Sequence, residues 1–134
     1  MLNLAQEFKE LQHKYYDLYN EWCKEIREMY IGSGLENYYL YYLRYELEGK
    51  HNEMYFVLTI LAQIQDVDVQ KLREVGTFFA LHCKYCVGNT EANWLKGRLE
   101  VAEMVQEDLK NLCDQVTFAH DFTIIPRQIE VKLC

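Results

Sequence analysis

Apolar side chains recur at spacings of three and four residues near the beginning of the chain and again in its last third. The first set comprises Leu4, Phe8, Leu11, Tyr15, Leu18, Trp22, Ile26 and Met29. The second comprises Leu95, Leu99, Ala102, Val105, Leu109, Leu112 and Val116. Because this spacing is the period of one face of an α-helix, it predicts two long amphipathic helices. Each helix must bury its apolar face against another element, so the pattern favours an all-α bundle.

Residues that typically begin or end helices divide the chain into about five predicted helices. They cover about 2–30, 35–48, 53–65, from Asp66 or Asp68 to 87, and 90–117. Gly49 is suited to the position that follows a helix, and Asn52 is suited to cap the next one. Gly76 lies inside the fourth predicted helix, where glycine is unfavourable, and this predicts a close helix crossing there.

Two segments leave alternatives open. Residues 54–65 are apolar around most of a helical circumference, which predicts a central, buried helix, but their composition also suits a strand. Residues 118–134 contain Pro126, the only proline, and alternate apolar and polar side chains over 129–133. This predicts an extended tail, and a strand there must pair within the chain or with another chain.

Length and charge narrow the class of protein. A chain of 134 residues fits one domain, which we take to span 1–134. Twenty-one acidic and fourteen basic residues give a formal net charge of −7. An acidic surface repels phosphates, so direct nucleic-acid binding is disfavoured, whereas a basic protein partner would suit it.

The apolar run 54–64 is too short to cross a bilayer, which predicts no membrane insertion. Five cysteines, an odd number, indicate reduced thiols and a cytoplasmic location.

Tyrosines crowd the second predicted helix more densely than one helix can bury. The residues that we predict to contact a partner are Tyr38, Tyr41, Tyr42, Arg44 and Tyr45. Exposed tyrosine beside arginine is typical of the energetically dominant part of protein interfaces. The alternative is a helix packed between neighbours, with the phenol hydroxyls at the water-exposed edge.

A cluster of potential metal ligands follows in the fourth predicted helix. His82, Cys83 and Cys86 lie at helical spacing, and Cys113 or His120 could complete a tetrahedral zinc site. A second pair of ligands and the βαβ setting of a redox motif are both missing. We therefore expect the cysteines to be small buried core residues, and predict no metal and no cofactor.

These features favour a non-enzymatic protein, since no phosphate-binding loop or nucleophile motif is present. We expect a small acidic interaction module of the cytoplasm that inhibits or regulates another protein, and we expect it to self-associate. The alternative is a helical module that binds a small molecule or a metal through the tyrosine cluster or through His82, Cys83 and Cys86.

Overall fold

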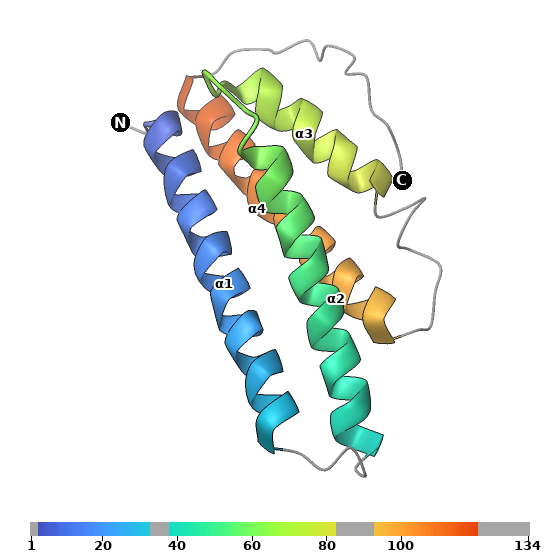
Figure 1. The fold of residues 1–134 in the computed structure, drawn as a ribbon. Helices are drawn as coiled ribbons and strands as arrows, with labels where there is room; N and C mark the ends of the chain where they lie inside the picture. The colour runs from blue at the N-terminus through green and yellow to red at the C-terminus, as the bar shows by residue number, and fades with distance from the viewer. Residues whose placement is uncertain (1–2, 33–37, 83–92, 121–134) are drawn as a thin grey trace.

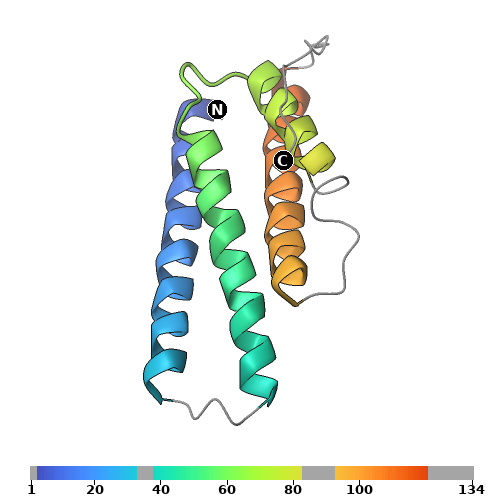
Figure 2. The same ribbon diagram turned by 45° about the vertical axis from the view of Figure 1, so that its right-hand side comes forward.

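The structure is a computed structural model that describes residues 3–32, 38–82 and 93–120 (Figure 1). Its elements are the helices α1 (Leu4–Gly32), α2 (Tyr38–Leu61), α3 (Val69–His82) and α4 (Asn93–His120). The predicted all-α bundle with two long amphipathic helices is confirmed, but the described residues form four helices rather than five. Figure 2 shows α1 and α2 as an antiparallel pair, with α3 lying along α4.

The count differs because α2 runs without a break through Gly49 and Asn52, which the sequence suggested as a helix end and a helix cap. Gly49 and Gly97 lie where α2 crosses α4. A Cβ atom on Gly49 would lie 2.8 Å from the carbonyl carbon of Trp94, and one on Gly97 would lie 3.0 Å from the backbone nitrogen of Lys50. The glycines therefore allow two helix backbones to touch, and neither one ends a helix.

The close crossing predicted at Gly76 is wrong, because no atom of another described element would lie within 4 Å of a Cβ atom there. The ambiguous segment 54–65 is helical up to Leu61 and forms a turn beyond it, which decides against a strand. The helix α4 extends to His120, three residues into the predicted tail. The rest of that tail, 121–134, lies outside the described residues.

All four helices contribute to one apolar core. Its fully or almost fully buried members include Phe8 and Tyr15 from α1, Met54, Val57 and Leu61 from α2, Leu72 and Phe79 from α3, and Val101, Val105 and Leu109 from α4. The sequence period correctly identified the buried faces of α1 and α4. Within the described residues, no helix is long and apolar enough to cross a membrane.

The turn between α2 and α3 is held by polar side chains. Asp66 adopts a left-handed backbone conformation with φ of 49°, which aspartate tolerates better than most residues. The Nζ atom of Lys71 donates to the carbonyl oxygens of Gln65 and Asp66, at 2.6 and 2.9 Å. The backbone N–H of Lys71 donates to the carboxylate of Asp68 at 2.7 Å, so Asp68 caps α3 as one of the two predicted candidates.

A buried hydroxyl joins α1 to α4. Tyr15 is fully buried, and its hydroxyl donates a 2.8 Å hydrogen bond to Asp108, which also pairs with Lys14 at 3.1 Å. Burial, reinforced by the Asp108 carboxylate, raises the pKa of Tyr15 far above its usual value. Its phenol therefore stays neutral and acts as a donor that aligns the two helices.

Candidate functional site

Two large apolar side chains stand out on the surface. Tyr16 of α1 and Tyr55 of α2 are 56% and 62% exposed, and they are the exposed large hydrophobic residues of the described part of the chain. A tyrosine ring that is exposed to water contributes little to the stability of the fold. Exposed aromatic rings that lie close together often mark a binding surface. The two tyrosines line the same groove.

This groove, which we call the tyrosine groove, lies between α1 and α2 and has a volume of about 600 Å³. The helix α1 lines it with Lys9, Gln12, His13, Tyr16 and Tyr19. The helix α2 lines it with Tyr55, Leu58, Thr59 and Ala62. Both sets repeat at spacings of three and four, so the groove is formed by one continuous face of each helix.

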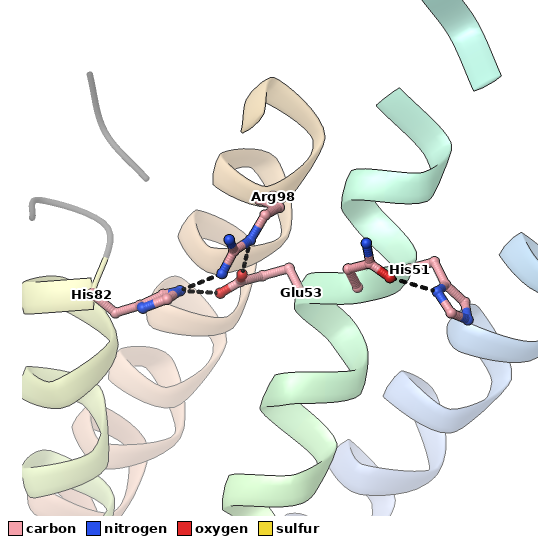
Figure 3. A network of polar contacts seen from close by, with 5 residues as sticks. His51, Glu53, His82 and Arg98 are labelled. Carbon is pink, nitrogen blue, oxygen red and sulfur yellow. Dashed lines mark hydrogen bonds and ion pairs between the residues drawn. The ribbon is translucent and has the colours of Figure 1, made fainter. Parts of the chain in front are cut away.

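One end of the groove is aromatic. The ring of Tyr19 stacks on His51 with centroids 4.6 Å apart and lies 6.3 Å from the ring of Tyr55. Figure 3 shows His51 directed toward α1, on the opposite side of α2 from Glu53. Partial burial, followed by the neighbouring Cys23 thiol, raises the pKa of Tyr19, so its phenol remains an uncharged hydrogen-bonding group.

The other end of the groove carries the basic side chains Lys9 and His13. Because α1 and α2 are antiparallel and Tyr19 lies opposite His51 and Tyr55, Lys9 lies near the Ala62 end of α2. None of the described residues that line the groove is acidic. The groove therefore differs in local charge from the chain as a whole, whose net charge is −7.

The side of α1 that faces α4 carries acidic side chains in place of exposed aromatic rings. A smaller hollow of about 350 Å³ between α1 and α4 is lined by Glu7, Glu10 and Asp108, with Lys14 held by Asp108. Glu7 and Glu10 therefore lie on the α4 side of α1, whereas the exposed ring of Tyr16 lies on the α2 side. The helix α1 thus separates two surfaces of different chemistry.

A second polar cluster lies inside the bundle, where α2, α3 and α4 meet (Figure 3). Glu53 is fully buried, and its Oε1 atom lies 2.7 Å from Nε2 of His82, which is 2% exposed. The Nε atom of Arg98 donates to Oε2 of Glu53 at 2.8 Å. The guanidinium of Arg98 also lies over the ring of Trp94, 4.9 Å from its centroid.

In this buried Glu53–His82–Arg98 cluster, two basic side chains lie against a carboxylate that would otherwise be very costly to bury. The imidazole of His82 lies against Phe56, with ring centroids 4.8 Å apart. Because Glu53 and His82 are almost completely buried, water and solutes have little access to them. The three side chains of the cluster come from α2, α3 and α4, so the cluster joins these helices. It also shows that Glu53, which sequence periodicity did not single out, is a structural residue.

The structure separates two of the residues suggested as metal ligands. His82 ends α3, whereas the thiol of buried Cys113 lies 4.0 Å from the carbonyl oxygen of Val69 at the start of that helix. Thirteen residues of helix separate the two positions by roughly 20 Å. Burial raises the pKa of Cys113, so it remains an inert thiol. Cys83 and Cys86 lie outside the described residues, among which no group of three metal-ligating side chains occurs.

The predicted tyrosine cluster lies at the start of α2. Tyr38, Tyr41 and Tyr42 belong to that helix, but their side chains lie outside the described part of the structure. Arg44 and Tyr45 are partly buried and in contact, with the guanidinium 5.4 Å from the ring centroid. The role of this cluster in binding therefore stays a prediction.

Sequence reasoning missed the tyrosine groove because each half of it is an ordinary helix face. Tyr16 and Tyr19 adjoin the apolar row of α1, and Tyr55 interrupts the apolar run of α2. A search for a second row of aromatic residues beside the core row of α1 would have found Tyr16 and Tyr19. Only the fold places Tyr55 opposite them.

The sequence matches no protein-family model, and comparisons with curated proteins and with solved structures found no match.

Proposed function

We propose that this protein is a protein-interaction module that binds its partner through the tyrosine groove. The observation that supports this most strongly is the exposure of Tyr16 and Tyr55 on facing helices. Tyrosine brings a large apolar area and a polar hydroxyl while losing little side-chain freedom on binding, and it is enriched among the residues that contribute most to interface affinity.

The shape of the groove favours a macromolecular partner over a small ligand. Pockets for small molecules enclose most of the ligand surface, whereas this groove is an open channel between two helices. Grooves between helices commonly accept the apolar face of a partner helix. By occupying such a segment of its partner, the protein would act as a regulator or inhibitor.

We place this interaction in the cytoplasm because Cys23 and Cys113 are free thiols, as are typical of reducing compartments. Self-association remains an expectation from the dense tyrosines and the predicted C-terminal strand, and a basic partner remains an expectation from the acidic composition. The acidic flank of α1, with Glu7 and Glu10, offers a surface for such a basic partner that is distinct from the tyrosine groove.

The test is affinity capture from cells of the source organism with three baits, followed by mass identification. The baits are the wild type, a Tyr16→Ala/Tyr55→Ala variant, and a Lys110→Ala/Asp114→Ala control that changes exposed residues of α4. We expect at least one partner to be retained by the wild type and the control and lost by the groove variant. All three should melt alike, because exposed substitutions shift stability by less than about 0.5 kcal/mol. Partners that bind all three baits equally would contradict the proposal.

A further inference from the structure

We infer that the tyrosine groove accepts an amphipathic helix that places a carboxylate beside Lys9. This inference rests on the proposed function and adds the chemistry of the bound segment. An acidic segment is the reverse of what the net charge of the whole chain would suggest, so the inference depends on the local arrangement of charges.

The first support is that Lys9 is a basic side chain at the groove that forms no ion pair with any described residue. Lys14, Lys50 and Lys96 each lie within 4.0 Å of a carboxylate of Asp108, Glu100 or Glu46. Within the part of the chain that the structure describes, Lys9 forms no such pair, and no acidic residue lines the groove beside it. The ammonium group is therefore available to a carboxylate supplied by a partner.

The second support is the order of basic and aromatic side chains along the groove. Lys9 and His13 lie at one end, Tyr16 lies in the middle, and Tyr19 and Tyr55 lie at the other end. Ten residues of α1 separate Lys9 from Tyr19, which is a length of roughly 15 Å or about three helical turns. A helix of that length can contact Lys9 with an acidic residue while its leucine-like face covers Tyr16 and Tyr55.

The experiment measures binding of two labelled peptides to the full chain by fluorescence anisotropy. Both peptides are amphipathic helices of about twelve residues with leucine along one face. One carries two glutamates at one end, and the other carries two lysines in their place. We expect the wild type to bind the acidic peptide about threefold more tightly than the basic one, as befits a solvent-exposed ion pair.

Charge reversal of the groove provides the decisive comparison. The Lys9→Glu variant should reverse the preference and bind the basic peptide more tightly. The Lys110→Glu variant has the same change in net charge on an exposed part of α4, and it should keep the wild-type preference. Binding of either peptide should weaken at least tenfold in the Tyr16→Ala/Tyr55→Ala variant, as expected when aromatic contacts in an interface are removed.

Three outcomes would overturn the inference. Binding that depends on Tyr16 and Tyr55 but ignores peptide charge would leave the proposed function standing while excluding the acidic segment. A failure of both peptides to bind would also reject it, and the affinity capture then decides separately whether the groove binds protein. A concentration-dependent dimer in sedimentation velocity, abolished by Tyr16→Ala/Tyr55→Ala, would identify a second copy of this chain as the occupant.

Discussion

Replacing Gly49 by alanine should destabilise the protein, although alanine is the better helix former. An exposed helical glycine replaced by alanine gains about 1 kcal/mol of stability. At Gly49, however, the added Cβ atom would lie 2.8 Å from the carbonyl carbon of Trp94 and 3.2 Å from the backbone nitrogen of Arg98. These are atoms of a helix backbone, which cannot rotate away as a side chain can.

The size of the effect follows from the separation that the methyl group requires. Carbon atoms pack at about 3.5–4.0 Å, and the carbonyl oxygen of Trp94 would lie even closer to the new Cβ than its carbonyl carbon, so α2 and α4 must move apart locally by roughly 1 Å or more. Overpacking of this kind costs about 1–3 kcal/mol. The displacement also weakens the hydrogen bond from Arg98 to Glu53, which places the cost at the upper end of that range. After the gain in helix propensity, we expect a net loss of about 2 kcal/mol.

Gly76→Ala is the matched control, because it makes the same chemical change inside α3, where no described residue of another element comes within 4 Å of the new Cβ. Thermal and urea unfolding followed by circular dichroism should show Gly49→Ala melting about 6–10 °C below the wild type. Gly76→Ala should melt at or slightly above it. If Gly49→Ala is as stable as Gly76→Ala, the close α2–α4 crossing is wrong.

Three further predictions concern polar contacts. Arg98→Met should lower the free energy of unfolding by about 3 kcal/mol by leaving the Glu53 carboxylate underpaired, and urea unfolding of Arg98→Met/Glu53→Met should recover most of the loss. Burial, followed by the neighbouring carboxyl group of Glu100, raises the pKa of Glu46 in the folded state, so ionisation of Glu46 destabilises the fold as pH rises above its unfolded value of 4.5. Glu46→Gln should therefore raise the melting temperature at pH 7 and change it little at pH 4, and equal effects at both pH values would contradict this. Asp68→Ala should cost about 1 kcal/mol in urea unfolding by removing the α3 cap, and a cost near zero would count against that cap.

The fold was predictable from the sequence wherever the spacing of apolar residues along a helix matches the face that the helix buries in the bundle. The apolar rows of α1 and α4 are long, and burial in the bundle follows them, as Phe8, Tyr15, Val105 and Leu109 show. The sequence did not reveal that α2 is one continuous helix, because glycine at position 49 is typical of a helix end. Its actual role depends on the backbone of Trp94 and Arg98 in α4, residues far away in the sequence.

The candidate site was harder to predict from the sequence, because it also depends on contacts between residues that are far apart in the chain. Tyrosines are recognisable as binding residues by type, but exposure decides which of them can bind. The prediction followed the densest run, around Tyr41 and Tyr42, and it stays untested because those side chains lie outside the described part of the structure, whereas Tyr16 and Tyr55 are exposed in the part that is described. The Glu53–Arg98 pair joins residues 45 positions apart, and no periodicity reveals such a pairing.

The most direct test of the central claim is site-specific photo-crosslinking in living cells of the source organism. Tyr55→p-benzoylphenylalanine places a photoreactive ring in the tyrosine groove, and Asp114→p-benzoylphenylalanine places the same ring on the exposed face of α4. We predict that irradiation joins the protein to a partner through position 55 and not through position 114, with loss of that product when Tyr16→Ala is added. Crosslinking only through position 114, or a position 55 product that is insensitive to Tyr16→Ala, would contradict a binding function of the groove.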